Sequence, residues 1–212
     1  AEKEVSPIVQ VCMNIRAPPV YGGARMFEAL RMDAEIRRIF AVNVRGFMQD
    51  GDTITAIATA PGVSAVAIVR VSGPQAVGVA DAVFRGRAPL SRAAGFTVHY
   101  GHAVDRYGEP VDEVLATVFR APHSYTGEDL VEFGCHGGAV VTAAVLDALL
   151  GAGARNAEPG EFTRRAFLNG KMDLSQAEAV ADLIGARSSR ARRASLEQLS
   201  GRLGSRVGEL RK

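Results

Sequence analysis

Several charged residues stand where apolar residues surround them, and they are the first candidates for chemistry. Arg70 ends the apolar run 65–69, where an unpaired guanidinium would be costly to bury, so we expect it to meet a specific anion. Glu132 lies inside an expected strand, where its carboxylate can accept two parallel N–H groups from a planar heterocycle or from an arginine. From the residues alone two alternatives stay open: Arg70 in solvent or paired with a neighbouring acid, and Glu132 on a sheet face toward water.

Basic residues also gather in the C-terminal part of the chain. Lys171 follows Gly170 at the exit of a short expected helix, where a solvated surface cation is the ordinary interpretation of a lysine. Residues 186–212 carry 8 basic and 2 acidic residues. This tail either contacts the phosphates of a nucleic acid or forms the charged outer face of an amphipathic helix, and the apolar stripe opposite favours the helix. Its first arginines are Arg187, Arg190, Arg192 and Arg193.

The two cysteines, Cys12 and Cys135, lie far apart and have no second cysteine or histidine pair at metal-binding spacing. They predict neither a disulfide framework nor a zinc site, and a reducing, cytoplasmic compartment fits best. Cys135 and His136 are neighbours in an expected strand and point to opposite faces, which excludes a nucleophilic dyad between them. Gly137 and Gly138 are better explained as a tight turn from strand to helix, where backbone N–H groups can meet an anion. We assign no catalytic residue and no metal ligand.

The apolar pattern predicts strands and helices in a mixed order, which is typical of an α+β fold with a mixed sheet. Ser175 and Glu178 match a capping box at a helix start. An apolar stripe at helical spacing runs from Leu196 to Leu210 and needs a partner. The expected strands are 53–59, 65–71, 96–104, 111–119 and 130–135, and the expected helices are 74–84 and about 139–150.

The composition is that of a soluble globular protein. The 212 residues are 47% hydrophobic and 23% charged, which excludes disordered, collagenous and disulfide-scaffold classes. The longest apolar run, 139–150, is broken by Asp147 and is too short to cross a membrane. Gly170 and Lys171 are followed by Met172, so the chain carries no Gly-x-x-x-x-Gly-Lys-Ser/Thr loop that would hold a nucleoside triphosphate.

Taken together, six motifs in one order resemble the MnmE (TrmE) family of tRNA-modification GTPases. The resemblance covers about residues 48–212. It implies a folate-binding and dimerisation domain at 48–165 and the beginning of a helical domain at 166–212, while 1–47 is an unmatched extension for which a transit peptide is the alternative. The motifs are 52–62 (DTITAIATAPG), 67–73 (AIVRVSG), 124–129 (SYTGED), 135–138 (CHGG), 159–163 (PGEFT) with 165–171 (RAFLNGK), and 173–184 (DLSQAEAVADLI).

The resemblance also implies a ligand and its contacts. The family's domain is similar to the folate domains of aminomethyltransferases, forms a homodimer and holds a 5-formyl-tetrahydrofolate-type one-carbon donor. Matched motif by motif, the ligand-binding positions are Arg70, Glu132 and Lys171. A pterin offers adjacent N–H donors suited to a carboxylate, and the glutamyl tail offers carboxylates suited to Arg and Lys.

Complete family members carry a G domain that hydrolyses GTP with potassium and magnesium. With the flavoprotein MnmG they modify C5 of the tRNA wobble uridine. We expect the G domain to be absent from residues 1–212, so the chain itself is not expected to hydrolyse GTP, and a standalone non-catalytic folate-binding or dimerisation module is the alternative. Two segments depart from the family pattern: 62–65 reads GVSA in place of a Gly-Arg-Gly-Gly-like turn, and 157–160 reads AEPG in place of Ala-Arg-Pro-Gly.

Overall fold

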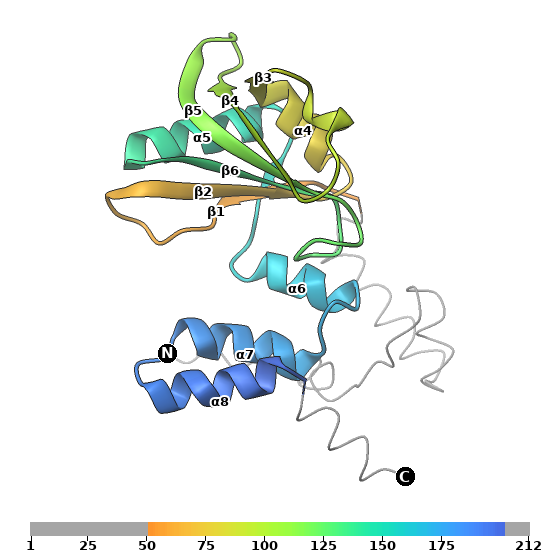
Figure 1. The fold of residues 1–212 in the computed structure, drawn as a ribbon, viewed down its shortest axis with the longest axis vertical. Coiled ribbons are helices and arrows are strands. Elements are labelled where there is room, and N and C mark those ends of the chain that lie inside the picture. The colour runs from red at the N-terminus through yellow and green to blue at the C-terminus, as the bar shows by residue number, and fades with distance from the viewer. Residues whose placement is uncertain (1–50, 202–212) are drawn as a thin grey trace, which may run out of the picture. The chain divides into compact units, whose positions relative to one another are not determined.

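The computed structural model describes residues 51–201 (Figure 1). They belong to two compact units, one up to Phe162 and one from Thr163 onward, whereas the sequence predicts the domain boundary after Arg165. The predicted extension 1–47 and the part of the apolar stripe beyond Gly201 lie outside the described residues. Within 51–201, no helix has the length and apolar character needed to cross a bilayer.

The first unit is built on one sheet of seven strands, which is mixed as the sequence predicts but has two strands more than the five expected. Their order in space is β3-β4-β5-β6-β2-β1-β7, and every neighbouring pair is antiparallel except β1 and β7. The strands are β1 (Ile54–Ile57), β2 (Ser64–Ser72), β3 (Phe84–Gly86), β4 (Thr97–Val104), β5 (Pro110–Phe119), β6 (Leu130–Gly137) and β7 (Arg155–Asn156).

Two helices, α4 (Ala76–Val83) and α5 (Ala139–Gly151), pack on one face of this sheet (Figure 1). Alternate residues of the central strands point into the core between sheet and helices, as the period of a strand requires. Val69 and Val131 are fully buried there, together with Val145 of α5. A short 3-10 helix, η1 (Leu90–Arg92), places Leu90 in the same core.

The opposite face of the sheet carries the other half of each strand's side chains. Arg70 of β2 lies in register with Glu132 of β6, and Glu132 with Thr117 of β5. Farther along this face, three apolar side chains are exposed: Val98 (58%), Tyr100 (61%) and Leu115 (51%). Apolar side chains therefore face outward on both β4 and β5.

The second unit contains the rest of α6 (Glu161–Leu168) and two helices, α7 (Leu174–Ile184) and α8 (Ser189–Leu199). Hydrogen bonds join α7 to α8: Gln176 Nε2 donates to the carbonyl of Leu199 at 2.8 Å, and Gln198 Nε2 to the carbonyl of Ser175 at 2.9 Å. The two helices form a pair that buries Ala179.

The predicted capping box at Ser175 and Glu178 is wrong by two residues. Asp173 is the N-cap of α7, and its carboxylate accepts from the backbone N–H of Gln176 while Gln176 bonds back to the N–H of Asp173. Ser175 lies inside the first turn and donates to Asp173 at 2.7 Å. Aspartate caps a helix as well as serine does, so residue type alone does not distinguish the two positions.

The helix predicted over 74–84 is shorter than expected. It begins at Ala76, because the backbone N–H of Gln75 is bonded to Thr53 Oγ1 at 2.9 Å and that of Ala76 to the carbonyl of Gly73 at 3.0 Å. It ends before Phe84, which starts the edge strand β3. The sequence pattern missed β3 and β7 because strands of two or three residues are too short to show alternation.

Alternation along β6 separates Cys135 from His136, as the sequence predicts. The Cys135 side chain is buried in the core at 3% exposure, and burial together with the charge of Asp112 raises the pKa of its thiol. His136 is exposed, and its Nδ1 lies 2.7 Å from Asp112 Oδ1. The thiol and the imidazole therefore form no dyad, and the cysteine is a core residue.

We expect the thiol of Cys135 to resist alkylation in the folded protein, since both burial and a raised pKa suppress the reactive thiolate. The measurement is iodoacetamide labelling at pH 8, followed by mass spectrometry, in a Cys12→Ser variant so that only one thiol is counted. Labelling should be at least about tenfold faster in guanidinium chloride than in buffer. Equal rates in the two conditions would show that Cys135 is accessible.

Candidate functional site

The candidate site is centred on an ion pair on the face of the sheet opposite to α4 and α5. Arg70 Nε donates to Oε1 of Glu132 at 2.8 Å, and Nη2 forms an ion-pair contact of 2.7 Å with the same oxygen. The side chains are 23% and 21% exposed. The pair joins neighbouring strands directly in register, so the sheet itself fixes the two charges against each other.

This arrangement leaves hydrogen-bonding capacity unused. Within residues 51–201, neither Oε2 of Glu132 nor Nη1 of Arg70 makes a hydrogen bond. One is an acceptor and the other a donor of two hydrogens, and both belong to partly exposed side chains. A ligand that carries donors and an acceptor along one planar edge can therefore bind without breaking the ion pair.

Two aromatic rings contact the guanidinium of Arg70. Its central carbon lies 5.2 Å from the ring centroid of Tyr125 and 5.3 Å from that of Phe162, which are cation–π distances. The rings come from separate segments, the loop before β6 and the first turn of α6. The charged pair thus has apolar walls, which strengthen electrostatic contacts by excluding water.

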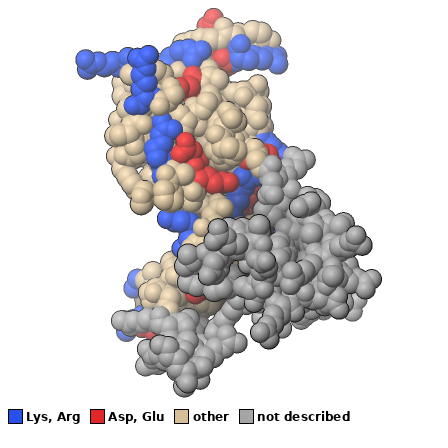
Figure 2. Space-filling view, turned by 90° about the vertical axis from the view of Figure 1, so that its right-hand side faces the viewer, with Lys and Arg blue, Asp and Glu red and all other residues tan. Residues whose placement is uncertain are grey.

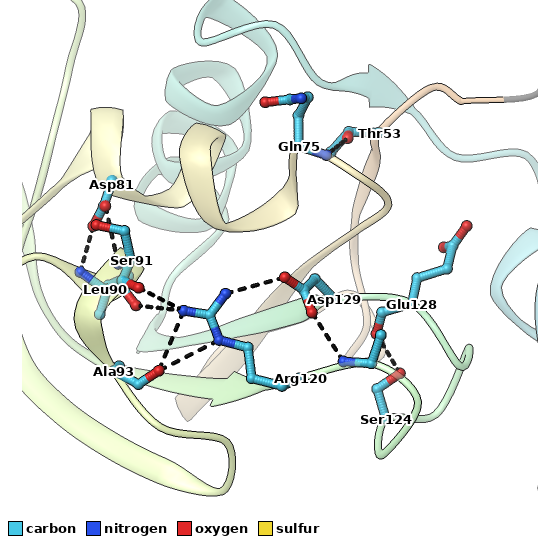
Figure 3. A network of polar contacts seen from close by, with 11 residues as sticks. Thr53, Gln75, Asp81, Leu90, Ser91, Ala93, Arg120, Ser124, Glu128 and Asp129 are labelled. Carbon is cyan, nitrogen blue, oxygen red and sulfur yellow. Dashed lines mark hydrogen bonds and ion pairs between the residues drawn. The ribbon is translucent and has the colours of Figure 1, made fainter.

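The loop that carries Tyr125 is anchored by an ion pair at its base (Figure 3). Arg120 Nη1 donates to Asp129 Oδ2 at 3.0 Å, and Asp129 Oδ1 accepts the backbone N–H of Ala121 at 2.9 Å. The same guanidinium reaches the carbonyl of Ser91 at 2.9 Å and that of Ala93 at 3.2 Å. Both ends of the loop are therefore closed by one arginine–aspartate contact.

Buried hydroxyl groups attach the middle of this loop to β2. Ser72, two residues beyond Arg70 on the same face, lies 2.7 Å from the hydroxyl of Thr126 and donates to Glu128 Oε2 at 2.8 Å. Ser124 donates to the carbonyl of Glu128 at 2.6 Å. The residues on both sides of Tyr125 are thus held, which limits where its ring can go.

Phe162 is held by a second ion-pair network. Glu161, the preceding residue, is 2% exposed and accepts from Arg155 Nη2 at 2.7 Å. Arg155 Nε also donates to Asp52 at 2.6 Å. These hydrogen bonds, first that to Glu161 and then that to Asp52, raise the pKa of the Arg155 guanidinium.

Lys171, the third predicted contact, belongs to the second compact unit. It is exposed and follows α6, where its backbone N–H donates to the carbonyl of Ala166 at 2.8 Å. The structure therefore brings Arg70 and Glu132 together, and the role of Lys171 stays a prediction. Sequence reasoning did not assign Tyr125 or Phe162, although both stand inside the motifs 124–129 and 159–163 that carry the resemblance.

Close packing against β2 requires a glycine at position 137, the first glycine of the strand-to-helix turn after Cys135. A Cβ on Gly137 would collide with the hydroxyl and carbonyl of Ser64, its partner on β2. Gly138 is the N-cap of α5 and has more room. Among residues 51–201, no group of three or more His, Cys, Asp or Glu side chains is arranged to hold a metal ion.

Comparisons with known proteins agree with the resemblance drawn from the motifs. Residues 53–171 match the family described as GTP-binding protein TrmE N-terminus. A protein of Salinibacter ruber named tRNA modification GTPase MnmE is 57% identical over 164 residues, which cover 77% of this chain and 35% of that protein. One of the same name from Enterococcus faecalis is 54% identical over 162 residues, 76% of this chain and 35% of that protein. The chain spans about a third of the length of these relatives, and it belongs to the MnmE (TrmE) family of tRNA modification GTPases, of which it contains the N-terminal region.

Proposed function

We propose that this chain binds a 5-formyl-tetrahydrofolate-type one-carbon donor through Arg70, Glu132 and Lys171. The observation that supports it is the half-buried Arg70–Glu132 pair, which keeps one acceptor and one donor unused beside two aromatic rings. A reduced pterin carries an amino group and a ring N–H next to a carbonyl, and this edge suits a carboxylate beside a guanidinium. The rings of Tyr125 and Phe162 offer apolar surface for the heterocycle.

The contact between Arg70 and Glu132 bears on how the folate is oriented. Matching the motifs alone leaves open which end of the folate each of the three residues meets. Because the Arg70 guanidinium lies 2.7 Å from Glu132, both residues must meet the same end of an extended ligand. We therefore assign both to the pterin end, with Lys171 as the partner for a tail carboxylate.

The rest of the proposal concerns the longer protein. We propose that it lies in the cytoplasm, hydrolyses GTP with potassium and magnesium in a G domain, and acts with the flavoprotein MnmG on the wobble uridine of tRNA. The support is the family membership and the relatives' name, tRNA modification GTPase. In this scheme residues 48–165 bind folate and dimerise, and residues 166–212 begin the helical domain, with no catalytic residue in the chain.

We further propose that the chain dimerises through the face of its sheet opposite to α4 and α5. Val98, Tyr100 and Leu115 are each more than half exposed there, and apolar side chains gathered on a sheet face are typical of interaction sites. A standalone folate-binding or dimerisation module would use the same face, so dimerisation does not separate that alternative from a longer enzyme.

RNA binding by this chain alone is the less favoured alternative. Arg190, Arg192 and Arg193 are exposed on α8, which suits phosphate contacts. On the face shown in Figure 2, however, acidic and basic side chains of the described residues both occur with uncharged surface between them. On that face the described residues therefore form no single basic surface for a nucleic acid.

Substitution of Glu132 by Gln should weaken binding of 5-formyl-tetrahydrofolate by about 10- to 100-fold, the range expected for one hydrogen bond to a charged group. Isothermal titration calorimetry on the purified chain measures it. Glu109→Gln, in an exposed turn, is the matched control and should bind as the unaltered chain does. A lack of binding by the unaltered chain would remove the proposal, whereas equal affinities of the two variants would remove only the role of Glu132.

Substitution of Leu115 by Glu should shift the chain from dimer to monomer, raising the dissociation constant at least about tenfold because a carboxylate would be buried in an apolar contact. Sedimentation equilibrium is the measurement. The control is Val140→Glu, at a residue 83% exposed on α5 away from this face. If both variants remain dimeric, the association uses another surface.

A further inference from the structure

A three-member ion-pair network closes the segment that carries Phe162. Arg155 of β7 pairs with Asp52 ahead of β1 at 2.6 Å and with Glu161 of α6 at 2.7 Å and 3.1 Å. All three residues belong to the first compact unit. The network therefore fastens the first turn of α6 to the strands β1 and β7.

Glu161 is the most constrained member. Its side chain is 2% exposed, and a buried carboxylate is tolerated only when its oxygens are paired. Arg155 binds both oxygens in a fork, and the backbone N–H of Glu158 donates to Oε2 at 2.8 Å. With both oxygens engaged, the carboxylate has little freedom to move.

Phe162 follows Glu161 directly, so the contacts that hold Glu161 also limit the position of Phe162. Fixing the backbone at Glu161 fixes the direction in which the next side chain leaves the helix. The Phe162 ring lies 5.3 Å from the Arg70 guanidinium, on the pair that carries the unused donor and acceptor. The buried carboxylate and the candidate site are thus linked through one aromatic side chain.

We infer that Glu161 and Arg155 are positioning residues, which hold Phe162 against Arg70 and so preorganise the ligand site without contacting the ligand. This inference rests on the proposed folate binding. If the Phe162 ring is held in place before binding, no entropy is lost in ordering it when the ligand binds. A change that makes the ring more mobile therefore lowers affinity even though the polar contacts remain.

Asp52 supplies a matched comparison. It also binds Arg155, but through Nε, whereas the fork to Glu161 uses Nη1 and Nη2, so we expect a substitution of Asp52 to leave the fork in place. If the network only joins strands, the Asp52→Asn and Glu161→Gln variants should affect ligand affinity alike. If it positions Phe162, affinity should depend on Glu161 and hardly on Asp52.

The experiment is a double-mutant cycle on the 212-residue chain, with 5-formyl-tetrahydrofolate as the probe and calorimetry well below the melting temperature of every variant. Glu161→Gln and Phe162→Leu should each weaken binding by about tenfold, and the double variant by no more than either alone, because both changes remove the same wall. Asp52→Asn should change affinity less than about twofold.

Several outcomes would overturn the inference. They are an unchanged affinity of Glu161→Gln, a double variant whose loss is the product of the two single losses, or an equal loss for Asp52→Asn. Circular dichroism melting curves identify a variant that fails to fold, and Arg155→Lys, which keeps the charge but not the fork, then replaces Glu161→Gln in the cycle with the same expected result. Failure of the unaltered chain to bind would contradict the proposed function instead, so the two failures are distinguishable.

Discussion

The pairing of β2 with β6 is the constraint on which the site depends. Arg70 and Glu132 meet because these strands are antiparallel and in register, and a slip of either strand by one residue would turn its charged side chain toward the core. That register is itself fixed by the apolar residues of the other face, since Val69 and Val131 must be buried. The same strand register thus determines both which apolar side chains are buried and where the two charges lie, so a change in one changes the other.

Two segments outside the sheet supply the aromatic rings that contact Arg70. The sheet presents a guanidinium and a carboxylate, but it supplies no cover for them. Tyr125 and Phe162 provide it from segments that the Arg120–Asp129 and Arg155–Glu161 pairs close. In both cases an ion pair away from Arg70 determines where an aromatic ring lies, so charge organises the apolar part of the site.

The sequence predicted the elements that are long enough to show a periodic apolar pattern, and it missed the features that depend on contacts between residues distant in the chain. The mixed sheet and α5 follow from alternation and apolar runs, whereas β3 and β7 are too short to show any period. The contact of Arg70 with Glu132 was not predictable, because strand order is a property of topology. For the same reason the sequence indicated charged candidate residues but no role for Phe162. The position of Phe162 depends on Glu161, and the sequence alone does not distinguish this buried glutamate from a surface glutamate.

The two arginine–glutamate pairs of the first unit differ in how much of the carboxylate the arginine engages. In the Arg155–Glu161 pair both carboxylate oxygens are engaged, and at 2% exposure the carboxylate is closed to a ligand. In the Arg70–Glu132 pair the guanidinium contacts a single oxygen, and the second oxygen remains on a side chain 21% exposed. A ligand that binds this oxygen adds hydrogen bonds to a pair already formed, and therefore avoids the cost of separating two partly desolvated charges. The two pairs thus differ in the number of carboxylate oxygens that the arginine contacts, and this difference leaves an oxygen available to a ligand only in the Arg70–Glu132 pair.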